Sequence, residues 1–321
     1  MTNAIGFLFV YNQNYLIILN KKMLKSNIKY PVAFDSVQEK LIEISKVNIE
    51  NKENLICKDC NESFVAVLNH QTPHFKHKPK SNCTANFESY VHWVTKELFK
   101  EIKSINVPEL LIDDLFEKQR EKFQLLYNKI IDSNIPEELR FEFKNELKRN
   151  LTDAQVLQID KIETEKEYKT DLGNVLIDIV TLSHNEKVFI EPFFSNPINQ
   201  EKKNKLSEID TSTLMLNLFD FIEYFGSNFE LETLKKYLIS DEGKNWVYIK
   251  KEDFDIFLNN YENYLSEEIK RFNPVIVLYE NKKEEILKIN NKLSKLFNKK
   301  DIIEKKISIL QNKVYDLGKE I

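Results

Sequence analysis

Short runs of apolar residues separated by polar ones dominate the first 56 residues of the chain. The runs are "IGFLFV", "YLIIL", "PVAFD" and "LICKD". Such alternation is typical of β-strands with one buried face. One segment, "SVQEKLIEISK", has helical spacing instead and predicts a helix. We therefore expect the N-terminal part to be rich in strands, with a strand pair near its beginning.

Two longer segments of the chain have helical periodicity. Residues 87–103 are predicted to form a helix, because four apolar residues recur there at helical spacing, at Val91, Val94, Leu98 and Ile102. A second helical block is expected over residues 108–152, with a break at Ser133–Pro136. These two segments separate the N-terminal strands from the second half of the chain.

A β-hairpin is predicted by "DIVTLSHNEKVFIEPFFSN", residues 178–196, because two apolar runs flank a polar turn. The preceding "VLQIDKIETEKEY" and the later "TLMLNL" and "NWVYIKK" predict further strands. Between these strands, "INQEKKNKLSEI" and residues 219–240 have helical patterns. The second half is thus expected to mix strands and helices.

From about residue 280 the apolar positions follow two interleaved seven-residue series. One is Ile286, Leu293, Ile307, Val314 and Ile321, with Lys300 in the gap, and the other is Ile289, Leu296, Ile303, Leu310 and Leu317. The offset alternates between three and four residues, as in the a/d seam of a coiled coil. We expect residues 279–321 to form a coiled coil that pairs two copies of the chain or docks another protein.

The C-terminal pattern leaves alternatives open. Lys300 occupies a core position, and Asp301 with Glu304 has the spacing of a capping box, which could start a new helix. The segment could therefore form an antiparallel hairpin instead of one long helix, although the pattern favours the long helix. It could also be a surface helix that packs on its own domain.

Composition narrows the functional classes. The chain has 321 residues, of which 42% are hydrophobic and 31% charged, enough for one large or two modest packed domains. With only five glycines, it has neither a P-loop nor a dinucleotide-binding fingerprint. No apolar run approaches the roughly 20 residues of a membrane helix, so no membrane partner is expected.

Charge and cysteine content add two expectations. The formal net charge is −4, so any contact with nucleic acid must depend on local basic patches. The chain has three cysteines, an odd number without the spacing of a disulfide framework. Cysteines in this number and spacing indicate a reducing compartment, and we expect the protein to be cytoplasmic.

All three cysteines lie in one short window that also contains several histidines. Cys57 and Cys60 have the Cys-x-x-Cys spacing with which two thiolates bind one tetrahedral ion. His77 and Cys83 could complete a structural zinc site, with His74 as the alternative nitrogen ligand. The competing interpretation is a pair of buried thiols beside surface histidines.

Single acids end the two apolar runs of the predicted hairpin, Asp178 in "NVLID" and Glu191 in "KVFIE". Carboxylates in such positions are paired, desolvated or held by a cation, and two on adjacent strands can share Mg²⁺ or Mn²⁺. Glu163 and Glu165 on the preceding strand are further candidates, or simply exposed strand charges.

One face of the predicted helix over residues 87–103 carries Glu88, His92 and Lys96 at four-residue intervals. Residues at this spacing lie one above another on a helix. The face is either a solvated surface with weak ion pairing or part of a functional site.

The order of these motifs resembles the competence protein CoiA-like family of the PD-(D/E)xK nuclease superfamily. The likeness rests on a Cys-x-x-Cys knuckle closed by "HFKH", a helix opening with "ESYVHWVTK", an Asp-bearing strand, a turn, a strand ending in Glu, and a Trp-bearing strand. It spans about residues 30 to 250. The order of the motifs, rather than any one of them, carries the likeness.

The resemblance implies a restriction-endonuclease-like α/β fold, with a mixed sheet flanked by helices. It implies an N-terminal β-rich region with a zinc knuckle (1–86), a nuclease-like core (87–278) with a helical insertion at about 105–152, and the coiled coil (279–321). Catalytic roles are implied for Glu88, Asp178, Glu191 and His92, and Lys96 matches a polar position that would contact nucleic acid.

The chain departs from the superfamily pattern two residues after Glu191. Phe193 stands where the superfamily usually has Lys or Gln. The superfamily sometimes supplies this lysine from a neighbouring helix, and "NPINQEKKNKL" offers Lys202 as the best candidate and Lys205 as the second. If neither reaches the site, the core is an inactive remnant that only binds.

We therefore expect a Mg²⁺- or Mn²⁺-dependent nuclease with a structural Zn²⁺, acting on DNA in bacterial nucleic-acid processing or anti-phage defence. Lys76, Lys78 and Lys80 after the knuckle would contact the phosphate backbone. The alternative is an inactive nuclease-fold protein that binds nucleic acid or assembles a complex through its coiled coil. An unrelated zinc-stabilised interaction protein is the third possibility.

Overall fold

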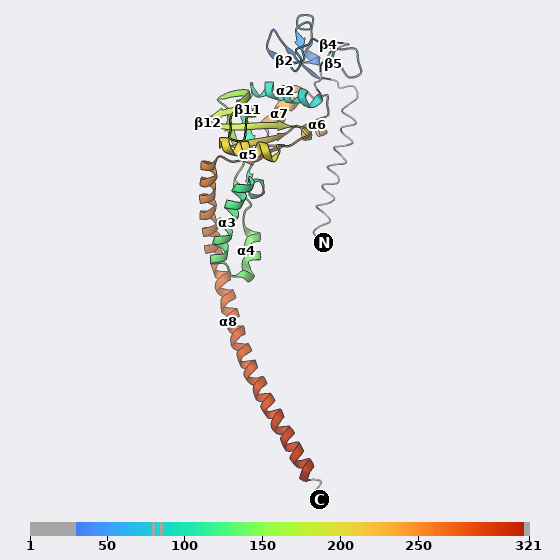
Figure 1. Cartoon of the computed structure of the whole chain (residues 1–321). Coiled ribbons are helices and arrows are strands. Elements are labelled where there is room, and N and C mark those ends of the chain that lie inside the picture. Colours follow the sequence, from blue (N-terminus) through green and yellow to red (C-terminus); the bar gives the residue numbers. More distant parts are fainter. Residues whose placement is uncertain (1–29, 79–80, 82, 84–85, 318–321) are drawn as a thin grey trace. The chain divides into compact units, whose positions relative to one another are not determined.

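The computed structural model describes residues 30–78, 81, 83 and 86–317, and side chains up to residue 312 (Figure 1). The strand pair expected near the beginning of the chain and Lys80 lie outside the described residues, as do the side chains of Val314, Leu317 and Ile321. The chain forms two compact units. Unit 1 contains residues up to Phe123 and Arg149–Asn259, and unit 2 contains Gln124–Lys148 and the chain from Asn260.

Unit 1 is built on a five-stranded mixed sheet with the order β10-β11-β12-β13-β14. β12 and β13 are parallel, and the other neighbours are antiparallel. The strands are β10 (Lys161–Tyr168), β11 (Val175–Ser183), β12 (Glu186–Phe193), β13 (Thr213–Asn217) and β14 (Lys244–Tyr248). The predicted hairpin is confirmed as β11 and β12, and the strands predicted at "TLMLNL" and "NWVYIKK" are confirmed as β13 and β14.

Helices cover both faces of this sheet. α2 (Phe87–Phe99), α6 (Leu218–Phe225) and α7 (Leu231–Ile239) share one hydrophobic core with Ile179 and Ile190 of the central strands. On the other face, Leu206 of α5 (Gln200–Ile209) packs with Ile177 and Phe189. In Figure 1, α2 lies above the sheet and α5 below it. The central hairpin is therefore accessible to side chains from two helices on opposite faces.

Residues 30–78 of unit 1 are rich in strands, as expected. β1 (Val32–Asp35) pairs with β2 (Lys40–Glu43) and β3 (Leu55–Ile56), and β4 (Phe64–Val67) forms a hairpin with β5 (His74–His77). The helix predicted at "SVQEKLIEISK" is wrong, because this segment forms β2 and the short 3-10 helix η1 (Ile44–Lys46). Buried Asp35 accepts hydrogen bonds from two backbone N–H groups of the tight turn after β1, and this turn directs residues 40–43 back along β1.

Tyr90 connects this region to α2. Its side chain is fully buried, and its hydroxyl accepts a hydrogen bond from the N–H of Val32 (2.8 Å) and donates one to the carbonyl of Val32 (3.1 Å). A buried hydroxyl with both bonds made is stable, whereas an unpaired one costs about 1–3 kcal/mol. The position of β1 on α2 is thereby specified.

The block predicted to be helical over residues 108–152 is helical only in its middle. α3 (Glu117–Asn134), η3 (Glu137–Leu139) and α4 (Arg140–Glu146) form there, and the break predicted at Ser133–Pro136 is confirmed. The flanks are strands instead, because they pair with each other. Within the block, β7 (Leu110–Leu111), followed by η2 (Ile112–Asp114), pairs with β8 (Asn150–Thr152), and just outside it β6 (Ser104–Val107) pairs with β9 (Gln155–Gln158).

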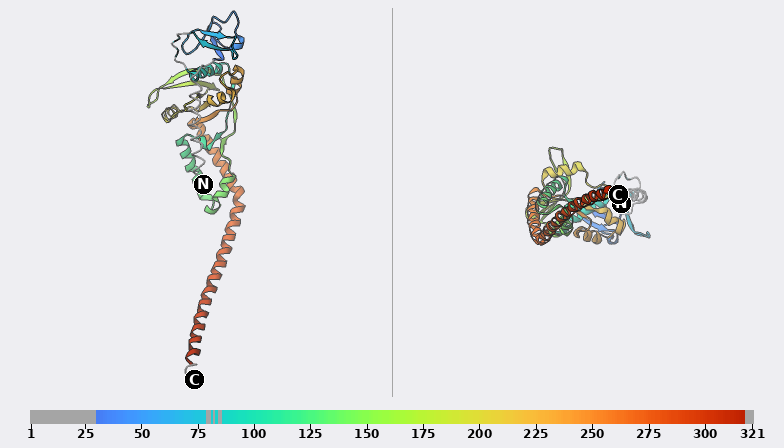
Figure 2. Two further views of the ribbon diagram at one scale, coloured as in Figure 1. Left: turned by 90° about the vertical axis from the view of Figure 1, so that its right-hand side faces the viewer. Right: turned by 90° about the horizontal axis from the view of Figure 1, so that it is seen from below.

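The C-terminal helix α8 (Lys251–Leu317) is one continuous helix (Figures 1 and 2). It begins well before the change in composition near residue 280, and no new helix starts at Asp301. In unit 2, Phe272 of α8 contacts Phe143 of α4, with ring centres 5.1 Å apart, and Leu265 and Ile276 are buried. Among the described residues, no helix is long and apolar enough to span a membrane.

Candidate functional site

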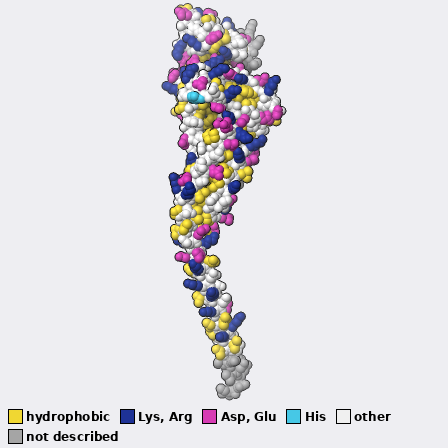
Figure 3. Space-filling model, turned by 90° about the vertical axis from the view of Figure 1, so that its left-hand side faces the viewer, with side chains coloured by type: hydrophobic (Ala, Val, Ile, Leu, Met, Phe, Trp, Pro, Cys, Tyr) yellow, Lys and Arg dark blue, Asp and Glu magenta, His cyan; other side chains and the backbone are white. Residues whose placement is uncertain are grey.

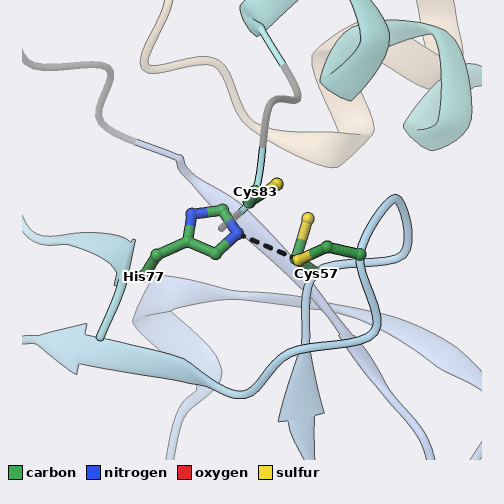
Figure 4. Close-up of side chains that lie close together, drawn as sticks. Cys57, His77 and Cys83 are labelled. Carbon is green, nitrogen blue, oxygen red and sulfur yellow. Dashed lines mark hydrogen bonds between the residues drawn. The ribbon is translucent and has the colours of Figure 1, made fainter. Parts of the chain in front are cut away.

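Four side chains of the N-terminal region form a Cys₃His cluster: Cys57, Cys60, His77 and Cys83. Their ligand atoms all lie within 4.8 Å of one another, and Cys60 Sγ is 3.4 Å from His77 Nε2. Figure 4 shows Cys57, His77 and Cys83 close together. Zinc bonds of about 2.0–2.3 Å in a tetrahedron place neighbouring ligand atoms about 3.5–3.8 Å apart. The cluster could therefore bind a structural zinc ion.

The local fold explains why these residues meet. Cys57 directly follows β3, and Asn61, with φ of 58°, adopts the left-handed conformation that closes a tight turn around Cys60. Hydrogen bonds from Asn61 N–H to the carbonyl of Cys57 (2.8 Å) and from Cys57 N–H to that of Glu62 (2.9 Å) fix the turn. His77, at the end of β5, packs edge-on against Phe64.

The protonation of the cluster without metal follows from burial. Burial raises the pKa of Cys57 to about 12, because a thiolate is costly to desolvate. Burial lowers the pKa of His77, which favours the neutral imidazole that a metal binds. Zinc binding must therefore release the Cys57 proton, and the ion supplies the positive charge that stabilises the thiolate.

His74, the alternative nitrogen ligand, lies outside the cluster. Its Nδ1 is 2.8 Å from the carbonyl of Thr72, and its ring contacts His70. Three positions separate His74 from His77 in β5, so the two side chains point to opposite faces. Lys76 and Lys78 beside the cluster are exposed.

A second group of candidate residues surrounds a hollow of about 290 Å³ in unit 1. Asp178 comes from β11 and Glu191 from β12, one residue beyond the paired Ile179 and Ile190. The other polar side chains that line the hollow come from the two flanking helices and the segment between β12 and α5: Glu88, His92, Asn196, Asn199 and Lys202. The sequence prediction that Glu88, His92, Asp178 and Glu191 lie together agrees with this arrangement.

Glu191 is the most buried acid of the hollow, with only 2% of its surface exposed. Its Oε2 forms an ion pair with Lys202 Nζ, and its Oε1 lies 3.4 Å from the backbone N of Asp178. The pKa of Glu191 is raised to about 7, mainly by burial; Lys202 opposes this rise and nearby Asp178 adds to it. Glu191 is thus a buried carboxyl group close to its titration point at neutral pH.

The structure distinguishes the two candidate lysines of α5. The N-terminus of α5 is capped by Asn199, whose side chain accepts a hydrogen bond from Lys202 N–H (2.8 Å). From this first turn, Lys202 reaches Glu191. Lys205 lies one turn further on and instead pairs with Glu201 Oε1 at 2.7 Å. Only Lys202 of these two contacts the acids of the hairpin.

The residues of α2 predicted to share a face point toward the same strands. Glu88 accepts hydrogen bonds from the Oγ (2.9 Å) and N–H (3.3 Å) of Ser195. Lys96 Nζ is 3.3 Å from Asp178 Oδ1. Between them, His92 lines the hollow, its buried Nε2 has no hydrogen-bond partner among the described residues, and burial lowers its pKa.

Glu165 joins this site through an unusual backbone conformation. Its φ is 55°, although it lies inside strand β10, between the paired positions Thr164–Ile179 and Lys166–Ile177. A residue other than glycine with positive φ inside a strand is strained, and such strain is often found at functional sites. The carboxylate of Glu165 accepts a hydrogen bond from Lys96 Nζ at 2.9 Å.

Of the two acids predicted as candidates on β10, Glu163 lies elsewhere. It pairs with Lys161 and Lys166. Ser195 and Asp59 were not predicted. Ser195 follows an unremarkable "EPFF" segment, and Asp59 belongs to the cysteine turn, so only the fold brings them near α2.

The cysteine turn also contacts α2. Lys58 Nζ lies 3.4 Å from Glu97 Oε1 and 3.6 Å from the centre of the Phe34 ring. Burial raises the pKa of Asp59, and Lys96 and Glu165 are close enough to influence it electrostatically. The candidate zinc cluster therefore supports the helix that carries Glu88, His92 and Lys96.

Comparisons with known proteins provide no relative: no protein-family model matches the chain, and neither the curated proteins nor the solved structures contain a match. Among the described residues, the Cys₃His cluster is also the only place where three or more His, Cys, Asp or Glu ligand atoms converge. The acids of the hollow offer fewer ligands.

Proposed function

We propose that the protein is a Mg²⁺- or Mn²⁺-dependent nuclease that hydrolyses phosphodiester bonds, with DNA as the expected substrate, on a restriction-endonuclease-like core of the CoiA-like type. One observation carries the proposal. Asp178 and Glu191 lie next to each other on adjacent strands, and Glu191 pairs with Lys202, which comes from α5 although Phe193 occupies the usual lysine position. Two acids and a lysine are thus present in one hollow.

The donor set fits a hard divalent cation. Mg²⁺ usually binds to proteins through one or two carboxylates and completes its shell with water and substrate phosphate, so two acids are sufficient. Asp178 and Glu191 would hold the ion, and Glu88 lies in the same hollow. When bound, such an ion lowers the pKa of a coordinated water and stabilises charge on the scissile phosphate.

The chain's own residues have separate tasks in this proposal. Lys202 favours the ionised form of Glu191 and would balance phosphate charge near the attacking water. Lys96, held by Glu165, orients Asp178. His92 is kept neutral by burial, so its Nε2 can exchange a hydrogen bond with a substrate or water that enters the hollow.

Contacts with nucleic acid would depend on local basic residues, because the net charge is −4. Lys76 and Lys78 are exposed beside the zinc cluster. Each lysine that neutralises a phosphate makes binding weaker as salt concentration rises. The proposed DNA contact is therefore local and salt-dependent.

Two observations support a second function, that of a nuclease-fold protein that does not cleave. Phe193 lines the hollow where a lysine is usual, and no third acid converges on Asp178 and Glu191 among the described residues. Both features suit a nuclease-derived protein that binds nucleic acid without cleaving it. The two functions differ in one measurable property, turnover.

A cleavage assay tests the proposal. Purified zinc-loaded protein is incubated with linear, circular and single-stranded DNA and with RNA, in Mg²⁺, Mn²⁺ or EDTA. The nuclease proposal requires cutting of at least one substrate that depends on the divalent ion. Binding without cutting on all substrates would favour the alternative, and neither binding nor cutting would refute both.

Replacing Lys202 with Met should lower the cleavage rate about 100-fold, because a charged group beside the developing phosphate charge is lost. The matched variant Lys205→Met removes the same charge from the same helix, but Lys205 pairs with Glu201 outside the hollow, so the rate should stay nearly unchanged. Initial rates on the best substrate provide the comparison. Equal losses in both variants would show that Lys202 has no special role.

Divalent metal binding should weaken as pH falls below 7. Glu191 has a pKa of about 7, so below this pH the ion must displace a proton from its carboxyl group. The apparent affinity should fall up to about tenfold per pH unit below 7 and level off above pH 8. Mn²⁺ titrations at several pH values measure this, and Glu191→Gln should remove the dependence. An affinity independent of pH in the unaltered protein would contradict the assignment.

A further inference from the structure

We propose that the part of α8 beyond unit 2's core, residues 286–310, binds a second copy of this chain as a parallel, in-register coiled coil. The inference concerns an interaction surface and holds whether or not the hollow cleaves nucleic acid. It rests on three features of α8: the continuity of the helix, its exposed apolar seam, and the placement of its charged residues.

The first feature is continuity. The two seven-residue series predict one seam only if the helix is unbroken, and α8 runs without interruption from Lys251 to Leu317. An antiparallel hairpin within one chain would need a turn near Asp301, and the helix continues through this residue. The chain therefore cannot cover its own seam by folding back at that point.

The second feature is an apolar seam exposed to solvent. The side chains of both series remain 44% to 60% exposed, at Ile286, Ile289, Leu293, Leu296, Ile303, Ile307 and Leu310. Figure 3 shows hydrophobic side chains at the surface of α8, interspersed with Lys and Arg. By contrast, Leu265, Phe272 and Ile276 nearer the start of α8 are buried. Exposed apolar patches of this extent mark binding surfaces.

The third feature is charge, and it selects the orientation. With Ile286 at position a, the flanking g positions hold Lys292, Lys299 and Lys306, and Glu304 is at position e. In a parallel pair, each g residue faces the e residue five positions further along the partner, so Lys299 meets the partner's Glu304. No like charges face each other at these positions.

An antiparallel pair would place g positions opposite g positions. Depending on the register, Lys299 would then face Lys299 or Lys306 of the second copy, with the other lysines of this edge close to them. Like charges along the edges of such a seam destabilise pairing, whereas the parallel arrangement has no like-charge pairs at its e and g positions. The charge pattern therefore favours a parallel second copy.

Lys300 at position a is compatible with this pairing. A single polar residue at position a fixes register and oligomer state in parallel coiled coils at some cost in stability. Its ammonium group lies 3.5 Å from Glu304 Oε1 of the same helix, so the charge is partly balanced while the aliphatic stem stays in the seam. In-register pairing places the two Lys300 residues in one layer, near the solvent-exposed edges.

Two substitutions at position d test the seam. Leu296→Asp with Ile303→Asp should weaken self-association at least about 100-fold, because two charges replace core side chains. The matched control is Asn291→Asp with Asn298→Asp, which adds the same charge on the opposite side of the helix and should leave association unchanged. Sedimentation equilibrium of the full, zinc-loaded chain measures the dissociation constant. A monomeric unaltered chain, or equal effects of both variants, would overturn the proposal.

A charge reversal tests the orientation. Lys299→Glu puts two negative charges opposite each other in a parallel pair and should raise the dissociation constant several-fold. In the antiparallel register that pairs Lys299 with Lys306, the same change would face Lys306 with Glu and lower the dissociation constant. In the register that pairs Lys299 with Lys299 the constant would rise, and the cysteine test then decides the orientation. A single cysteine provides a second readout: Lys300→Cys should form a disulfide between copies, above the background of the unsubstituted chain. Tighter association of Lys299→Glu, or no disulfide, would overturn the parallel arrangement.

Discussion

Replacing Asp178 with Asn and Glu191 with Gln should abolish metal-dependent cleavage while the protein stays folded. The expected loss is at least about 10³-fold, or roughly 4 kcal/mol of transition-state stabilisation, because both proposed ligands of the ion lose their charge. The amides keep the shape of the side chains. The Glu191→Gln change also removes a buried carboxylate whose pKa is already raised to about 7, so the free energy of unfolding should change little.

A matched control for this double variant is Glu163→Gln with Glu208→Gln. Glu163 pairs with Lys161 and Lys166, and Glu208 accepts hydrogen bonds from the N–H groups of the turn at Asp171 and Leu172, so neither lines the hollow. Cleavage by this control should remain near that of the unaltered protein. If the two double variants lost activity equally, the assignment of the acids would be wrong.

Loss of the zinc ligands should cause the largest change in stability. Cys57→Ser is expected to abolish zinc binding and to lower the melting temperature by about 10 °C or more, since a structural zinc ion contributes its binding energy to folding. Cys57 is almost fully buried, and the strands around it are short. Metal analysis and thermal unfolding measure the two effects.

The zinc variant should also lose activity, although it leaves the hollow unaltered. The cysteine turn contacts α2 through Lys58 and Glu97, and β1 contacts it through Tyr90. Unfolding of this region would remove support from the helix that carries Glu88 and Lys96. His74→Ala is the control, because His74 lies outside the cluster, and it should keep zinc. Full zinc content in Cys57→Ser would contradict the proposed site.

The hairpin and the α2 face could be predicted because local pattern and environment agree there. Two apolar runs flank "SHNEK", which predicts a turn between two strands. Each run carries one acid at its end away from the turn, so the hairpin brings Asp178 and Glu191 side by side. Likewise, Glu88, His92 and Lys96 are four residues apart on a helix whose opposite face is buried. Their side chains therefore lie on one face of the helix in any tertiary fold. The Cys-x-x-Cys spacing constrains the cluster in a similar manner.

Other features depend on contacts between distant segments. Glu163 and Glu165 look alike in "IETEKEY", and only the left-handed conformation of Glu165 opposite Asp178 brings its carboxylate to Lys96. The segment "SVQEKLIEISK" has helical spacing, but pairing with β1 overrides it. The flanks of residues 108–152 likewise become strands because each finds a partner on the other side of the insertion.

The sequence pattern alone does not decide whether Lys202 or Lys205 contacts Glu191, whereas the structure does. Both lie on the same predicted helix within one turn, and sequence could only rank them. The Asn199 cap sets where α5 begins, and this start directs Lys202 toward Glu191 and Lys205 toward Glu201. A shift of one residue in the cap would rotate both side chains by about 100°, since a turn has 3.6 residues.

Mn²⁺ occupancy and cleavage, measured in the same samples, show whether an ion bound in the hollow is the catalytic one. Electron paramagnetic resonance measures bound Mn²⁺ at pH 8, and a labelled DNA substrate reports the cleavage rate as Mn²⁺ concentration increases. If Asp178 and Glu191 hold the catalytic ion, the rate should rise in parallel with occupancy, and the Asp178→Asn/Glu191→Gln variant should lose both. Occupancy of the hollow without cleavage of any substrate, or cleavage that persists in the variant, would contradict this role.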